Sequence, residues 1–209
     1  MSYKARNGCD ITRDCDDTTR VRNCCEGVCD CDEVSDRIYD LLKTGDLILF
    51  RSQRWTRNFV YFTHVGMIVD LNGEKFVLEL NKKYYKKDIV PGVKLYKLLS
   101  RIANFDGKIY IAPINRIEKS SIYKLLNNLN EYYNIKFDKY MFFTLLKNTF
   151  KIKNKKRTGM FCSEFIGYIL QNIDILDKNY KIDTLFPESI LDLKNKNNER
   201  IFKGYLRIK

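Results

Sequence analysis

The dipeptide Asn72-Gly73 lies between two β-rich runs, and this arrangement constrains the fold more than any other feature of the sequence. The runs cover residues 65–69 and 75–80 and are rich in branched apolar and aromatic residues. Asn-Gly is a strong signal for a two-residue β-turn, because both residues tolerate the positive φ that such a turn requires. We therefore predict an antiparallel hairpin in which Leu71 pairs with Glu74 and pairing continues outward from there.

This register has a consequence for His64, the single histidine of the chain, which opens the first run. His64 would face Asn81 and Glu79 would face Gly66, so Glu79 becomes the diagonal neighbour of His64 on one face of the hairpin. Diagonal backbone positions lie about 7–8 Å apart, within reach of two long side chains. Gly66 leaves space for the approach. A carboxylate there can hold one imidazole nitrogen and present the other outward, as the orienting member of a catalytic triad does.

The remaining hydrophobic pattern predicts one domain of the α+β class. We expect a short helix or turn over 37–43, a tight turn over 44–46, and strands over 47–50 and 108–114. A helix capped by Ser120 or Ser121 should follow, and a second helix, rich in aromatic residues, should cover 138–151. Two apolar stripes at helical spacing mark the first and third helices: Ile122, Leu125, Leu126 and Leu129, then Phe161, Phe165, Ile169, Leu170 and Ile173.

Cys162 lies where the third helix should begin, and it is the one cysteine beyond residue 31. The positive end of the helix dipole favours a thiolate at such a position, and the free backbone N–H groups can receive an oxyanion. A cysteine, a histidine and a carboxylate are the minimum set for nucleophilic acyl chemistry. Two structural interpretations stand beside this one: a cysteine among phenylalanines as a small buried apolar residue, and a histidine with a purely structural role.

The N-terminal part of the 209-residue chain differs in composition from the rest. Residues 1–36 hold five basic and nine acidic residues, a net charge of −4. Because the whole chain has a net charge of +12, residues 37–209 carry +16. We predict that 1–36 is an acidic, cysteine-rich, disordered tail and that 37–209 is a single domain. A zinc-bound tail and an oxidised tail stay open, although the cysteine spacing is unlike that of zinc knuckles. Its cysteines are Cys9, Cys15, Cys24, Cys25, Cys29 and Cys31.

The positive charge of the domain admits nucleic acid, anionic lipid or acidic protein as partners, beside a lysine-rich surface that is simply solvated. We find no RRM, helix-turn-helix or zinc-finger signature, so nucleic acid is disfavoured. No run approaches the roughly 18 apolar residues of a membrane span, and residues 1–36 lack the apolar core of a secretory signal. We expect a cytoplasmic protein, because a reduced Cys162 suits the cytosol.

An ordered set of segments resembles the circularly permuted papain-like cysteine hydrolases of the NlpC superfamily, which include YiiX-like, poxvirus and lecithin:retinol acyltransferase-like proteins. In ordinary papain-like enzymes the cysteine precedes the histidine, whereas here His64 precedes Cys162. The resemblance covers roughly residues 43–190. It rests on Gly45-Asp46-Leu47-Ile48-Leu49-Phe50, Trp55, His64-Val65-Gly66-Met67-Ile68-Val69, Val77-Leu78-Glu79, Val90-Pro91-Gly92-Val93, Phe161-Cys162-Ser163-Glu164-Phe165 and Phe186-Pro187-Glu188.

The resemblance implies that Cys162 is the nucleophile, that His64 is the general base and then acid, and that Glu79 orients His64. It implies a small antiparallel sheet or half-barrel packed on helices, and attack on an amide or ester of a peptide or lipid through an acyl-thioester. No cofactor and no metal are expected. The alternatives are a catalytically inactive binding or virion-associated protein of the same fold and a nucleic-acid-binding module, and the complete triad favours the enzyme. A viral source would place the protein in the host cytoplasm or the virion.

The sequence departs from the family pattern in its tail and in residues 136–157, which precede the cysteine. This segment is typical of an aromatic amphipathic helix followed by the basic residues Lys151, Lys153, Lys155, Lys156 and Arg157. A helix facing the core, followed by a solvated loop, is one interpretation. Docking of the basic segment 151–157 on an anionic membrane or an acidic substrate is the other.

Overall fold

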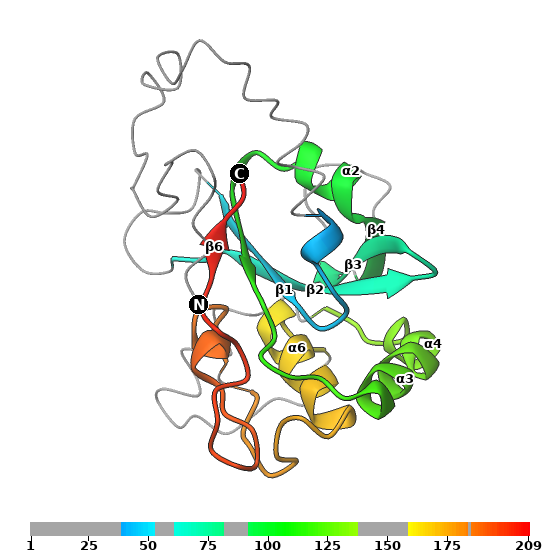
Figure 1. Ribbon diagram of the computed structural model, residues 1–209, viewed down its shortest axis with the longest axis vertical. Helices are drawn as coiled ribbons and strands as arrows, with labels where there is room; N and C mark the ends of the chain where they lie inside the picture. The colour runs from blue at the N-terminus through cyan, green and yellow to red at the C-terminus, as the bar shows by residue number, and fades with distance from the viewer. Residues whose placement is uncertain (1–38, 53–60, 82–91, 138–158, 184) are drawn as a thin grey trace, which may run out of the picture. The chain divides into compact units, whose positions relative to one another are not determined.

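The computed structural model describes residues 39–52, 61–81, 92–137, 159–183 and 185–209 (Figure 1). The chain divides into two units, Met1–Leu41 and Leu42–Lys209. Residues 39–41 of the first unit are helical, within the predicted range 37–43. Several predictions lie outside the described residues: the boundary between residues 36 and 37, the cysteines of the tail, Trp55, the helix over 138–151 and the basic segment 151–157.

Six strands of the second unit form one antiparallel sheet in the order β4-β3-β2-β1-β5-β6 (Figure 1). With the helices described below, the sheet gives the mixed α+β class that the hydrophobic pattern predicts. Strands β1, β2 and β3 extend by one or more residues beyond the predicted ranges 47–50, 65–69 and 75–80. The six are β1 (Leu47–Ser52), β2 (His64–Leu71), β3 (Glu74–Asn81), β4 (Gly92–Lys97), β5 (Gly107–Ala112) and β6 (Leu206–Arg207).

The hairpin of β2 and β3 has the predicted turn and register. Asn72 and Gly73 have φ of 56° and 87°, the positive values that a two-residue hairpin turn requires. The ladder runs from Leu71 opposite Glu74 to Met67 opposite Leu78. The predicted pairing of strands 65–69 and 75–80 is thus confirmed over this ladder. It places the start of β2 and the end of β3 side by side at the open end of the hairpin.

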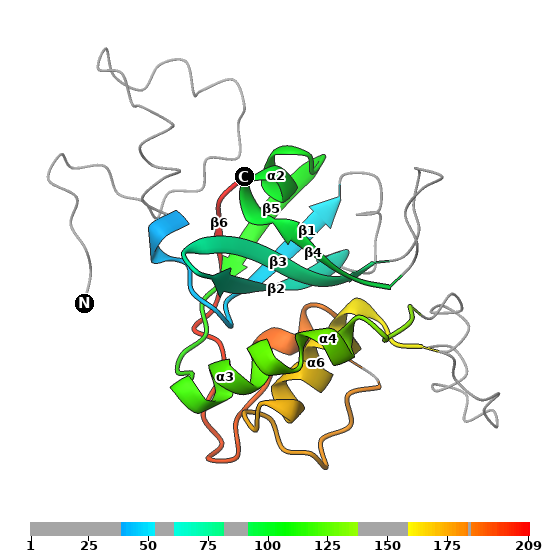
Figure 2. The same ribbon diagram turned by 90° about the vertical axis from the view of Figure 1, so that its right-hand side faces the viewer.

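Helices lie on both sides of the sheet (Figure 2). Helix α2 (Leu98–Ala103) lies on one side, and α3 (Lys119–Asn127), α4 (Leu129–Tyr132) and α6 (Cys162–Asn172) lie on the other. A short 3₁₀ helix, η2 (Ser189–Asp192), follows α6 in the chain. The third predicted helix is therefore confirmed, and its first residue is Cys162.

The apolar stripe of α6 is buried against the sheet, as its spacing predicts. Phe165, Ile169 and Leu170 have no exposed area and share one core with apolar residues of β1, β2 and β3. Burial of a side chain of this size contributes about 1.5–3 kcal/mol. This packing fixes the position of α6, and with it the position of Cys162.

The predicted cap of the helix at 119–127 is wrong. Neither Ser120 nor Ser121 occupies the N-cap, which falls at Glu118 and has no side-chain cap hydrogen bond. The Ser121 hydroxyl is buried and donates instead to the backbone carbonyl of Ile173, at a distance of 2.8 Å. A buried hydroxyl needs a partner, and the carbonyl that ends α6 supplies one.

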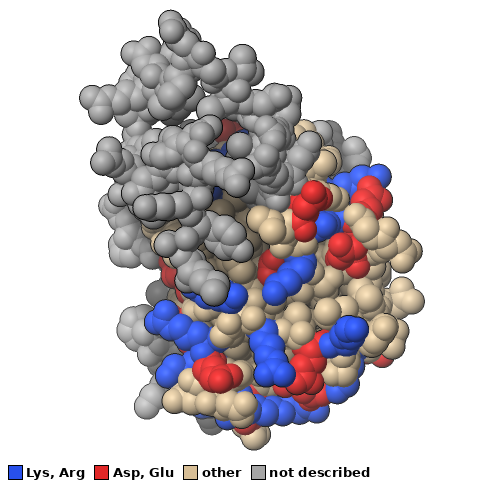
Figure 3. Space-filling model, in the orientation of Figure 1, with Lys and Arg blue, Asp and Glu red and all other residues tan. Residues whose placement is uncertain are grey.

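Basic and acidic side chains are interspersed over the face drawn in Figure 3. Among the described residues, no helix has both the length and the apolar character needed to cross a bilayer.

Candidate active site

His64 is the first residue of β2 and pairs with Phe50 of β1. The two rings lie 5.5 Å apart between centroids, so Phe50 supports one side of the imidazole. The His64 side chain is 15% exposed, which leaves an edge of the ring open.

Glu79 approaches His64 across the hairpin as the register predicts. Its Oε2 lies 2.5 Å from His64 Nε2, and the carboxylate is completely buried. Gly66 lies beside Glu79: a Cβ added at Gly66 would come within 3.2 Å of Glu79 Cβ and 2.7 Å of Val77 Cγ1. The absence of a side chain at Gly66 therefore makes room for the carboxylate, in agreement with the prediction.

Arg101 of α2 also binds Glu79, and the sequence did not point to it. Its Nε donates to Glu79 Oε1 at 2.6 Å and its Nη2 donates to Oε2 at 3.3 Å. The guanidinium lies 4.3 Å from the centroid of the Phe50 ring. Its local sequence carries no signal for this contact, although a carboxylate that is buried requires a cation or several donors.

Cys162 is the first residue of α6 and is 5% exposed. It lies close enough to the His64 ring to contribute to the raised pKa of that imidazole. Glu79 occupies Nε2, so Nδ1 is the ring nitrogen that remains for the thiol. The three predicted site residues, Cys162, His64 and Glu79, are thus brought together, with the imidazole linking the other two.

The charges of the site shift two pKa values in opposite directions. Burial alone would lower the pKa of His64, but the electrostatic interactions with Cys162 and Glu79, together with hydrogen bonding, outweigh it and raise the pKa from 6.5 to about 9. Burial alone would raise the pKa of Glu79, but the charge and hydrogen bond of His64, followed by those of Arg101, lower it from 4.5 to about 2. Near neutral pH, therefore, the imidazole is protonated and the carboxylate is ionised.

The first turn of α6 is held firmly around Cys162. Glu164 Oε2 accepts a hydrogen bond from the Phe161 backbone N–H at 3.0 Å, as in one half of a capping box. Ser163 Oγ donates to the carbonyl of Leu185 at 2.5 Å. The first turn of a helix presents backbone N–H groups and the positive end of the helix dipole, which are suited to binding negative charge at the thiol.

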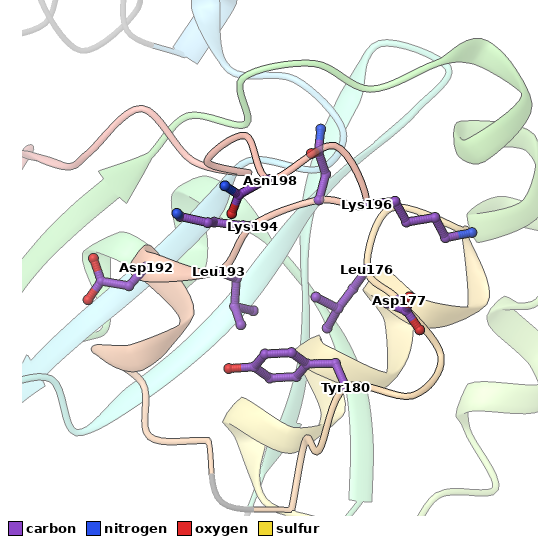
Figure 4. Close-up of a pocket in the computed structure, with 9 residues that line it drawn as sticks. Leu176, Asp177, Tyr180, Asp192, Leu193, Lys194, Lys196 and Asn198 are labelled. Carbon is purple, nitrogen blue, oxygen red and sulfur yellow. The ribbon is translucent and has the colours of Figure 1, made fainter.

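A cavity of about 430 Å³ lies elsewhere in the domain (Figure 4). Its walls come from residues 176–198, beyond the C-terminal end of α6, and include Leu176, Tyr180 and Leu193. Cys162, His64 and Glu79 are not among the residues that line it. Among the described residues, no group of three or more His, Cys, Asp or Glu side chains is arranged to hold a metal ion.

Comparison with known proteins finds similarity at the level of the fold. No family model matches the sequence, and no curated protein matches it. The fold is similar to that of a solved structure, the metalloprotein YiiX from Escherichia coli O157:H7, with a TM-score of 0.45 and 16% sequence identity over 80% of this chain and 96% of that one.

Proposed function

We propose that the protein is a thiol hydrolase or acyltransferase of the permuted papain-like type, acting on an amide or ester. Cys162 is the nucleophile, His64 is the general base and acid, and Glu79 orients His64. One observation carries the proposal: the His64 ring is hydrogen-bonded to a buried, arginine-bound carboxylate and lies close to a cysteine at a helix N-terminus.

The reaction begins with the proton of Cys162 on His64. The sulfur attacks the carbonyl carbon of the substrate, a C–S bond forms, and the carbonyl electrons move to oxygen, where the first-turn N–H groups of α6 stabilise the negative charge. The C–N or C–O bond then breaks as His64 gives its proton to the leaving group. Water or a second nucleophile, losing its proton to His64, attacks the thioester, and the C–S bond breaks to regenerate Cys162.

The pKa shifts suit this role. With a pKa of about 9, His64 is protonated at neutral pH and stabilises a neighbouring thiolate. Glu79, with a pKa of about 2, stays ionised and keeps the His64 Nε2–H fixed. The imidazole therefore holds the proton that the leaving group needs before substrate arrives.

The substrate proposed is a peptide or an acyl lipid, and the compartment is the cytoplasm, where a catalytic thiol stays reduced. Contact of the basic segment 151–157 with an anionic membrane remains a prediction. Replacement of its five Lys and Arg residues by Gln should weaken binding to vesicles that contain phosphatidylserine, and unchanged binding would remove that prediction.

The test uses an activated ester, p-nitrophenyl acetate, which needs no knowledge of the substrate. Wild type and the variants His64→Gln and Cys162→Ser are mixed with the ester at pH 7 and quenched in acid, and the acetylated residue is mapped by mass spectrometry. We expect acetyl-Cys162 in wild type, formed about 10²-fold or more slowly in His64→Gln. If Cys162 stays free, or reacts equally in both proteins, the enzyme proposal fails and a binding protein of the same fold takes its place.

A further inference from the structure

The Arg101 side chain is fixed in one place from several directions. Its two donors contact both oxygens of Glu79, the fork geometry that distinguishes Arg from Lys. Its guanidinium lies against Phe50 at 4.3 Å and near Phe105 at 5.5 Å from the ring centroids. The side chain is 19% exposed. A guanidinium held by two hydrogen bonds and two rings has little freedom to leave the carboxylate.

The helix that carries Arg101 is itself fixed at both ends. At its start, Leu98 is completely buried. At its end, the Lys209 ammonium donates to the carbonyls of Ile102, Ala103 and Phe105 at 2.9, 3.3 and 2.7 Å. A cation at a helix C-terminus satisfies carbonyls that lack partners within the helix. The six residues of α2 are thereby held at a constant distance from β3.

Glu79 needs this partner for both its charge and its orientation. A completely buried carboxylate with one hydrogen bond can rotate about its last side-chain torsion, and burial favours its protonated form. Bonds to both oxygens stop that rotation and offset the cost of burial. Oε2 is then directed at His64 Nε2, which directs Nδ1 at Cys162.

We infer that Arg101 is a positioning residue of this site, which acts through Glu79 to fix the His64 ring against Cys162. The inference rests on the proposed function and adds a fourth residue, from a helix on the opposite side of the sheet from α6. Other titratable or charged groups face Glu79 from the surrounding elements. They are His64 from β2, Lys94 and Tyr96 from β4, and Cys162 from α6 beyond His64.

The test compares Arg101→Met, Arg101→Lys and the control Arg200→Met, which removes an exposed arginine paired with exposed Asp192. The first readout is the NMR titration of His64, which gives one unambiguous signal because the chain has one histidine. The second is the rate at which iodoacetamide alkylates Cys162 at pH 6. Thermal unfolding identifies any variant that does not fold.

In wild type and Arg200→Met the His64 signal should stay constant from pH 6 to pH 3, because Glu79 remains ionised. In Arg101→Met the signal should show a new step in this range as Glu79 takes up a proton, and alkylation should slow by about 10–100-fold. Arg101→Lys keeps the charge, so the step should be absent, but one ammonium cannot hold both oxygens and alkylation should still slow. If Arg101→Met does not fold, the rate of Cys162 alkylation in Arg101→Lys tests the inference.

The inference would be overturned if both Arg101 variants showed the same His64 titration and the same rate of Cys162 alkylation as wild type. Failure of the proposed function gives a different result: alkylation of wild-type Cys162 would be the same in His64→Gln, while the titration of His64 would still report whether Arg101 holds Glu79.

Discussion

Replacement of Glu79 by Gln should destabilise the domain by an amount that depends on pH. Glutamine has the size of a glutamate, so the variant removes the charge and replaces one of the two acceptor oxygens, which bind His64 and Arg101, by an NH2 group. The pKa of Glu79 lies near 2 in the fold, against 4.5 for an unburied glutamate in the unfolded chain. At about 1.4 kcal/mol for each pH unit, the ionised carboxylate contributes about 3 kcal/mol to the free energy of unfolding.

The sign follows from the direction of the shift. A lowered pKa gives stability that is present above pH 4.5 and is lost as the pH falls through about 2. The charge should account for about 3 kcal/mol of the difference between wild type and Glu79→Gln at pH 5.5 and about 1 kcal/mol at pH 3, while the lost acceptor oxygen adds a cost that does not change with pH. His64 acts at the other limit, since its raised pKa gives stability that is present below pH 6.5 and is lost through about 9. Both shifts report largely the same ion pair, so the two contributions are not added.

Urea unfolding of both proteins at pH 3, 5.5 and 7 measures this difference, and the subtraction cancels the other carboxylates. Glu74→Gln is the matched control in the same strand, because Glu74 pairs with Lys97 and their side chains are 49% and 67% exposed. That change should cost less than about 1 kcal/mol at every pH. A Glu79→Gln cost below about 1 kcal/mol at pH 5.5, or one that does not shrink in acid, would refute the assignment of a buried ion pair.

Three further substitutions test the packing and the hydrogen bonds of the domain by urea unfolding. Gly66→Ala places a Cβ 2.7 Å from Val77 Cγ1 and should cost about 1–3 kcal/mol; an unchanged stability would show that the hairpin has room there. Gly167→Ala favours the helix by about 1 kcal/mol but meets Leu185 Cδ1 at 2.8 Å, so a net loss is expected and a net gain would contradict it. Asp46→Asn leaves one of two backbone N–H groups without an acceptor, at about 1–3 kcal/mol, and a neutral result would contradict that role.

The parts of the fold that the sequence predicts well depend on interactions between residues close together in the chain. The turn at Asn72-Gly73 sets the register of β2 and β3, and the register alone brings Glu79 to His64. The stripe of α6 likewise follows from its own spacing. Strand β6 has two residues, both exposed, and presents no pattern to detect.

The missed features depend on contacts between distant residues. The hydroxyl of Ser121 bonds a carbonyl 52 residues away, so its local sequence suggests a cap that does not form. Arg101 lies in a six-residue helix on the far side of the sheet, and its partner is 22 residues earlier. Periodicity and turn chemistry carry no information about such pairs. The approach of Cys162 to His64 was likewise implied by the family resemblance and not by spacing.

The most direct measurement of the central proposal is the pH dependence of Cys162 alkylation by iodoacetamide. It is followed by mass spectrometry in wild type and His64→Gln, with the same cysteine in urea-unfolded protein as the reference. An ordinary thiol reacts with a midpoint near pH ~8.5, whereas a thiolate paired with an imidazolium reacts well below that. We predict that folded wild-type Cys162 reacts faster than the unfolded reference at pH 6 and that His64→Gln abolishes the difference. An inert Cys162, or identical profiles in both folded proteins, would contradict a catalytic pair.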